Sequence, residues 1–315
     1  MAELQAITFL NESGLRLFGT LHRPTQPNDA LPTVILLSPG VKMRVGPGRL
    51  YVPLTELMNS LGYTVLRFDF HGLGDSEGEL EETMLADVYN HIEVGRYVGD
   101  TLSAMRWLRE QHGSKRFMLG GLCGGAITAL LAAQRDPSVE SLLSLGMTVT
   151  LASNAATPAK YLTRAQLDSR RQGYYRRLLQ PMSWWRLLTF QSEYGVIWRS
   201  LQRLFVKQPP AAAPAAPATP AAIDQRGNAN PLFPPAYFAF LQRGGKALMI
   251  FSEKDRLQSE YEEKFVQPYA AQLSELTSQI EQHVIPHANH VLSFREWQEQ
   301  MLVLSQRWLA RLHAC

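Results

Sequence analysis

The residues best suited to chemistry are Gly121-Leu122-Cys123-Gly124-Gly125, which lie between an apolar run typical of a strand and a run typical of a helix. A nucleophile between glycines at such a turn occupies a strained, exposed position, and side chains at the glycines would collide with the neighbouring strand and helix. The N-terminus of the following helix favours a thiolate, and the Gly124 amide could bind an oxyanion. The alternative is a buried structural cysteine in a glycine-rich turn.

A cysteine nucleophile needs a base, and the base needs an orienting acid, here expected in the chain order nucleophile, acid, histidine. Asp255 follows a predicted strand, and His290 lies in the loop before the last predicted helix. The sequence therefore predicts a triad of Cys123, Asp255 and His290. His287 is the rival base and Glu253 the rival acid. A surface aspartate and a loop histidine without a catalytic role are the alternative.

A second amide is expected to complete an oxyanion hole with that of Gly124, from the loop after an earlier strand. The run TVILL leads into Ser38-Pro39-Gly40-Val41-Lys42, where the glycine lets the backbone turn toward the site. We expect the Val41 amide to be this second donor. An ordinary Pro-Gly turn is the alternative.

Strands and helices alternate around these residues, which predicts an α/β fold with a mostly parallel sheet and helices on both of its faces. The predicted strands are 15–22 (antiparallel), 33–37, 64–68, 116–119, 141–147, 246–251 and 280–285. The predicted helices are 51–62, 87–112, 126–135, 259–277 and 293–312.

One segment, 150–235, interrupts this alternation, and we interpret it as a helical lid inserted into a core formed by 1–149 and 236–315. Within it, 209–222 consists of eight Ala, five Pro and one Thr. Proline removes backbone donors and alanine cannot build a core, so this tract is expected to be semi-extended and disordered.

Composition sets the broad class. The chain has 315 residues, 45% of them hydrophobic and 19% charged, which fits a globular protein that needs no disulfide or metal for stability. The net charge of +3 gives no argument for nucleic acid, and no run approaches the ~20 apolar residues of a membrane span. The acidic start does not resemble a signal peptide, so we expect a cytoplasmic protein. No His, Cys or acidic cluster has the spacing of metal ligands, and no cofactor is expected.

The stretch FDFHGLGDSEG, 68–78, resembles the Asp-x-x-Gly-x-Gly-x-Ser loop of the α/β-hydrolase superfamily. With the cysteine turn, the aspartate and the late histidine, the resemblance covers most of the chain outside the insertion. It implies the α/β-hydrolase fold, with Asp69, His71 and Asp75 as structural residues of the loop. The family more often has His-Gly where Ser38-Pro39-Gly40 stands here.

Within this superfamily, the Gly-Leu-Cys turn followed by Gly-Ala resembles the cysteine-type hydrolases associated with the exosortase A system. The phrases YYRRLLQPMSWWRLL and HANHVLSFREW extend that resemblance. A cysteine nucleophile forms a thioester, which water attacks slowly and thiols or amines attack readily. This reactivity allows either hydrolysis or acyl transfer. We expect an acyl hydrolase acting on an ester or thioester. The alternatives are an acyltransferase moving acyl or aminoacyl groups between carrier-protein thiols and, less favoured, a non-catalytic docking protein.

The segment 160–207 differs in charge from the rest of the chain. It carries ten basic and two acidic residues, a net charge of +8, whereas the remainder has −5. This asymmetry indicates docking of an anionic partner, such as an acidic carrier protein, a phosphopantetheine arm or an anionic lipid surface. The alternative is a solvated lid whose aromatic residues line a substrate pocket.

Overall fold

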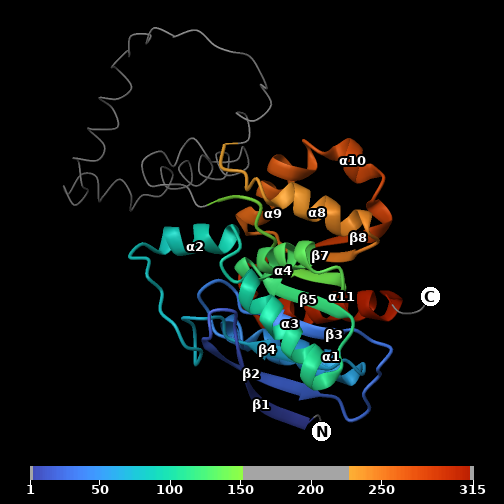
Figure 1. The fold of residues 1–315 in the computed structure, drawn as a ribbon. Helices are drawn as coiled ribbons and strands as arrows, with labels where there is room; N and C mark the ends of the chain where they lie inside the picture. The colour runs from blue at the N-terminus through green and yellow to red at the C-terminus, as the bar shows by residue number, and fades with distance from the viewer. Residues whose placement is uncertain (1–2, 152–226, 313–315) are drawn as a thin grey trace, which may run out of the picture. The chain divides into compact units, whose positions relative to one another are not determined.

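The computed structural model describes residues 3–151 and 227–312, and within them eight strands form one sheet (Figure 1). The strands are β1 (Glu3–Leu10), β2 (Arg16–Arg23), β3 (Thr33–Leu37), β4 (Val65–Phe68), β5 (Phe117–Leu122), β6 (Val139–Leu145), β7 (Lys246–Ser252) and β8 (Ile280–Ile285). Their order is β1-β2-β4-β3-β5-β6-β7-β8. The pairs β1–β2 and β2–β4 are antiparallel, and every other pair is parallel. The α/β-hydrolase fold expected from the sequence is confirmed.

Helices cover both faces of the sheet, and each face has its own hydrophobic core. The helices are α1 (Tyr51–Ser60), α2 (Leu85–Glu93), α3 (Val98–His112), α4 (Gly124–Arg135), α8 (Phe233–Gln242), α9 (Arg256–Tyr261), α10 (Ala270–Ser274) and α11 (Arg295–Leu312). One core contains buried residues of α1 and α11, and the other contains residues of α2, α3, α4 and α8.

Strand β3 shows why the central strands are apolar throughout. All five residues of TVILL are buried. Val34 and Leu36 belong to the core beneath α1 and α11, whereas Ile35 and Leu37 belong to the opposite core. Successive side chains of a strand point to opposite faces, so a strand covered on both faces has no polar side. The strand therefore holds the loop that follows it in a fixed place.

Two long helices predicted from the sequence are interrupted in the structure. The segment 87–112 forms α2 and α3, separated by a turn in which Gly95 has a φ of 103°. The segment 259–277 contains the end of α9, a π-helical stretch at Glu262–Val266 and α10. Strand β1 and helix α8 were not predicted.

The boundary of the insertion also needs correction. Residues 228–235 belong to the same compact unit as the sheet, although the sequence assigned them to the lid. Asn230 donates from its backbone to the Val149 carbonyl (2.8 Å) and from its side chain to the Glu93 carbonyl (2.6 Å). Most of the predicted helical lid, including its Ala/Pro tract and its basic segment, falls within 152–226, outside the described residues.

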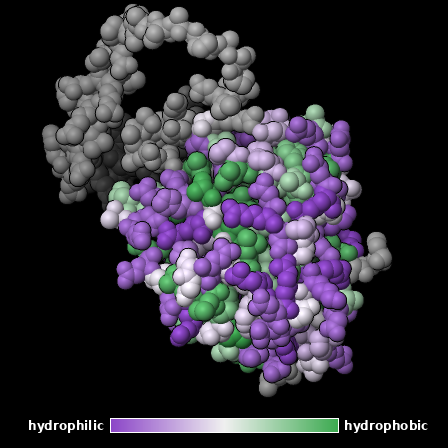
Figure 2. Space-filling model, in the orientation of Figure 1, coloured by the Kyte–Doolittle hydropathy of each residue, from purple (hydrophilic) through white to green (hydrophobic). Residues whose placement is uncertain are grey.

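The surface of the described residues is mostly polar, as expected where apolar side chains are buried in the two cores. The face seen in Figure 2 is mainly hydrophilic, with separate hydrophobic spots. A search of the described helices found none long and apolar enough to cross a membrane.

Candidate active site

Cys123 lies at the turn between β5 and α4, in a backbone conformation that side chains rarely adopt. Its φ and ψ are 55° and −116°, and its amide donates to the Leu145 carbonyl of β6 (2.9 Å). A Cβ on Gly121 would lie 2.5 Å from the carbonyl carbon of Gly125, and one on Gly125 would lie 2.5 Å from the Leu37 oxygen. Only glycine fits at both positions, which is why the glycine-flanked turn forms here.

Tyr51, the first residue of α1, stabilises this turn, and no sequence pattern indicated that role. Its buried hydroxyl donates to the Leu37 carbonyl (2.8 Å) and accepts from the Leu122 amide (2.7 Å). Burial raises the pKa of Tyr51 far above its ordinary value, and the nearby Cys123 raises it further. The neutral hydroxyl therefore ties β3 to the residue before the cysteine at every physiological pH.

His290 and Asp255 come from the two loops that follow β8 and β7, and the fold brings them together beside Cys123. The His290 Nδ1 lies 2.5 Å from the Asp255 Oδ2. Hydrogen bonds with Asp255 and then with Cys123 raise the pKa of His290 to about 10, against an opposing effect of burial. Gly146, directly after β6, has a φ of 60°, and a Cβ there would lie 3.8 Å from Asp255 and 3.9 Å from His290. The pair is thus packed closely against the end of β6.

The rival residues form a separate pair. The His287 Nδ1 lies 3.2 Å from the Glu253 Oε2, and the two side chains are 80% and 40% exposed. Glu253 also accepts the His287 backbone amide (2.5 Å). Neither residue lines the cavity at Cys123. The predicted base His290 thus lines the cavity at Cys123, and its rival His287 does not.

The loop after β3 approaches the start of α4. A Cβ on Gly124 would lie 3.1 Å from both the N and the Cα of Gly40, whose φ is 58°. The Lys42 amide closes a turn on the Pro39 carbonyl (3.1 Å). Among the described residues, we find no recorded acceptor for the Val41 amide, and the Gly124 amide, at the first position of α4, has no partner within its helix.

A cavity of about 240 Å³ opens at this edge of the sheet. It is lined by Tyr89, Glu93, Cys123, Thr148, Thr150, Asp255, Arg256, Leu257 and His290. The triad predicted from the sequence is thus gathered at one cavity. The sequence analysis missed Glu93, Thr148 and Thr150 there, since their types and spacing match no motif.

The loop resembling Asp-x-x-Gly-x-Gly-x-Ser holds its own network. The buried Asp69 accepts the Arg44 backbone amide (2.6 Å) and also binds the Arg44 guanidinium. The His71 Nδ1 lies 2.8 Å from the buried Asp100 carboxylate. These contacts fix the loop after β4, and none of its residues lines the cavity at Cys123.

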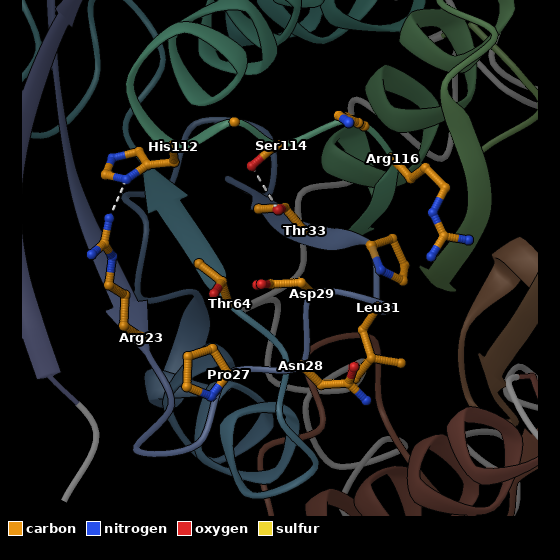
Figure 3. A pocket seen from close by; sticks show the side chains of 13 residues that line it. Arg23, Pro27, Asn28, Asp29, Leu31, Thr33, Thr64, His112, Ser114 and Arg116 are labelled. Carbon is orange, nitrogen blue, oxygen red and sulfur yellow. Dashed lines mark hydrogen bonds between the residues drawn. The ribbon is translucent and has the colours of Figure 1, made fainter.

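A second cavity, of about 580 Å³, lies near the amino ends of β3 and β4 (Figure 3). Its polar side chains contact one another, since Arg23 donates to the His112 Nδ1 and Thr33 is 2.8 Å from Ser114. Neither Thr33 nor Ser114 lies between glycines in a strand-to-helix turn like the one at Cys123. Among the described residues, no group of three or more His, Cys, Asp or Glu could hold a metal.

Similarity to known proteins defines the class of protein to which this chain belongs. The model of the α/β hydrolase fold family matches residues 46–296, so the chain belongs to that family. Its fold is similar to that of the Pyrococcus furiosus esterase Pf2001, with a TM-score of 0.56 and 16% identity, covering 98% of this chain and 90% of the esterase. It is also similar to dienelactone hydrolase from Anabaena variabilis, with a TM-score of 0.52, 14% identity and 98% of each chain covered.

Curated relatives add a nearer sequence similarity. The chain is 30% identical over 134 residues to the mitochondrial palmitoyl-protein thioesterase ABHD10 of Bos taurus, which covers 41% of this chain and 40% of the relative. The human protein of the same name is 28% identical over 130 residues, covering 40% of this chain and 39% of the relative. The chain therefore spans about two fifths of the length of these relatives.

Proposed function

We propose that the chain is a thioesterase-like acyl hydrolase in which Cys123 is the nucleophile, His290 the general base and Asp255 the residue that orients His290. The observation that carries this proposal is that the His290–Asp255 pair, with 2.5 Å between Nδ1 and Oδ2, lines the same cavity as Cys123. The similarity to thioesterases named for palmitoyl-protein substrates supports a thioester as the bond that is cleaved.

The reaction would proceed through a covalent acyl-enzyme. The Cys123 sulfur gives its proton to His290 and attacks the carbonyl carbon, and the tetrahedral intermediate then collapses to the acyl-enzyme as the bond to the leaving thiol breaks. His290 gives its proton to that leaving group. His290 then takes a proton from water as the water attacks the acyl-enzyme, and the carboxylic acid leaves Cys123.

The oxyanion of each tetrahedral intermediate would be held by the amides of Gly124 and Val41. The close approach of Gly40 to Gly124 supports this pairing, because it brings the two backbone segments together. The Asp255 carboxylate keeps the His290 Nδ1 protonated, so that the Nε2 is the atom that exchanges protons.

Intact-protein mass spectrometry during hydrolysis of an acyl N-acetylcysteamine thioester tests the proposal. We expect an acyl adduct on Cys123 and free carboxylic acid as the product. Cys123→Ala should lose both, whereas the matched variant Cys315→Ala should keep both. Hydrolysis at the wild-type rate by Cys123→Ala would overturn the assignment of the nucleophile.

Acyl transfer to a carrier thiol is a second candidate, which the +8 charge of 160–207 favours. The same experiment separates the two reactions when an acidic carrier protein with a phosphopantetheine thiol is added. Transfer predicts that the acyl mass moves from Cys123 to the carrier faster than to water. Release to water at an unchanged rate would assign the chain to hydrolysis.

A further inference from the structure

Glu93 is a buried carboxyl group in the wall of the active-site cavity that the proposed mechanism does not use. The residue is only 4% exposed, yet it lines the cavity together with Cys123. Its Oε2 accepts a hydrogen bond from the Thr148 hydroxyl (2.7 Å). No other hydrogen bond to this carboxyl group is recorded from the described residues. A buried carboxyl group with one partner has unused hydrogen-bonding capacity directed at whatever fills the cavity.

Glu93 lies on α2, and two residues of this helix, Tyr89 and Glu93, line the cavity at Cys123. Tyr89 and Glu93 are four residues apart and so share one face of the helix. Tyr89 lies against the loop after β3, since a Cβ on Gly40 would be 2.9 Å from the Tyr89 ring. Glu93 lies one turn further on, a rise of about 6 Å for four residues. Because Cys123 and Glu93 line one cavity of about 240 Å³, an acyl chain whose carbonyl is at Cys123 occupies a space that Glu93 borders.

The charged groups around Glu93 favour its protonated form. Burial raises the pKa of Glu93 to about 8, the Thr148 hydrogen bond opposes this shift, and the nearby Glu260 carboxylate adds to it. Arg256 acts in the opposite sense on Glu93, and its Nη1 is 3.7 Å from a Glu260 oxygen. Thr150 donates to the other Glu260 oxygen (2.9 Å). At neutral pH, Glu93 is thus mainly an uncharged acid with a proton to donate.

We propose that Glu93 is a specificity-determining residue that selects short acyl groups bearing a hydroxyl group a few carbons from the thioester carbonyl. This rests on the proposed function. A plain alkyl chain would displace water from Glu93 without replacing its hydrogen bonds, whereas a hydroxyl group both donates and accepts. Leaving one buried polar group unpaired reduces binding by roughly 10- to 100-fold.

The test measures binding separately from turnover. The probes are ketones in which a methylene group replaces the thioester sulfur of the hexanoyl, 3-hydroxyhexanoyl and 3-aminohexanoyl derivatives of N-acetylcysteamine, and calorimetry gives their affinities. We expect wild type to bind the hydroxy ketone about 10- to 100-fold more tightly than the plain ketone. Glu93→Leu should abolish that preference, Glu93→Gln should keep part of it, and the exposed Glu110→Leu on α3 should keep all of it.

Equal affinities in wild type, or tighter binding of the amino ketone, would overturn the proposal, as would an undiminished preference in Glu93→Leu. The wild-type comparison and Glu93→Gln carry the test if Glu93→Leu does not fold. Hydrolysis of the plain hexanoyl thioester by wild type, and its loss in Cys123→Ala, report on the proposed function separately. A hydroxyl preference in binding without any hydrolysis would support the role of Glu93 and contradict the hydrolase.

Discussion

The two loops that follow β7 and β8 contain two histidine–carboxylate pairs of different character. His290 and Asp255 are 2.5 Å apart, with side chains 38% and 11% exposed. His287 and Glu253 are 3.2 Å apart and 80% and 40% exposed. Both pairs join the same two loops, so sequence position alone does not distinguish them. They differ in burial, and only His290 and Asp255 line the cavity at Cys123.

The electrostatic consequences of the two pairs also differ. The pKa of His290 rises to about 10 because Asp255 and Cys123 both bind its protonated form. In the more exposed pair, His287 and Glu253 (the outer pair), it is the pKa of the carboxyl group that changes. The hydrogen bond from the His287 backbone amide is the main cause that lowers the pKa of Glu253. The outer pair thus links the two loops at the exposed surface, whereas in the inner pair, His290 and Asp255, the histidine holds its proton more tightly.

The largest expected difference between the pairs is in catalysis by their histidines. His290→Ala should lower kcat/KM by at least ~100-fold, the usual effect of losing a general base. His287→Ala should change it by less than ~3-fold, because an exposed pair contributes little to the fold. Steady-state hydrolysis of an acyl thioester measures both. The inverse order of effects would assign the base to His287.

The carboxylates should show a smaller contrast of the same kind. Asp255→Asn should lower kcat/KM by roughly 10- to 1,000-fold, because the amide holds His290 in the wrong tautomer. Glu253→Gln should be near wild type. Circular dichroism of Asp255→Asn provides the control for folding. A wild-type rate in a folded Asp255→Asn variant would show that another residue orients the base.

Sequence reasoning succeeded where a local pattern has one physical explanation. The turn at Cys123 could be predicted because glycine alone fits at both of its flanks, and the buried strands because they are apolar throughout. The order of Cys123, Asp255 and His290 predicted that the three lie together, since parallel strands end at one edge of a sheet, and all three line one cavity. The roles of these residues stay predictions.

The failures arose where tertiary contacts decide the outcome. Nothing in the periodicity of 87–112 shows that Gly95 ends a helix, because the apolar spacing continues across it. The contact of Asn230 with the core joins residues far apart in the chain. Tyr51 and Glu93 belong to helices whose patterns look ordinary, and their importance comes from what they face.

The reactivity of Cys123 sharpens the comparison further. Because His290 keeps its proton up to a pH of about 10, it can stabilise the Cys123 thiolate across the neutral range. His290→Ala should therefore slow alkylation by iodoacetamide at pH 6–7 by about 10-fold or more, because the imidazolium that stabilises the reacting thiolate is removed. The two proteins should converge at alkaline pH, where His290 no longer carries its charge. An equal slowing in His287→Ala would show that the outer pair also reaches Cys123.

The smallest expected contrast is in the pH dependence of stability. The pKa of His290 is about 10 in the folded protein and 6.5 in the unfolded chain, so the folded state binds the proton more tightly. By linkage, this contribution is complete below about pH 6.5 and is lost as the pH rises toward 10. Since the His290 side chain is 38% exposed, solvent screening reduces the effect.

Urea unfolding of wild type, His290→Ala and His287→Ala at pH 6 and pH 10, under reducing conditions, measures this contribution. We expect His290→Ala to lose more stability relative to wild type at pH 6 than at pH 10, because the favourable pair exists only while His290 is protonated. The His287→Ala variant should differ from wild type by the same small amount at both values. A larger loss for His290→Ala at pH 10 than at pH 6 would mean that the protonated pair destabilises the fold, which would contradict this use of linkage.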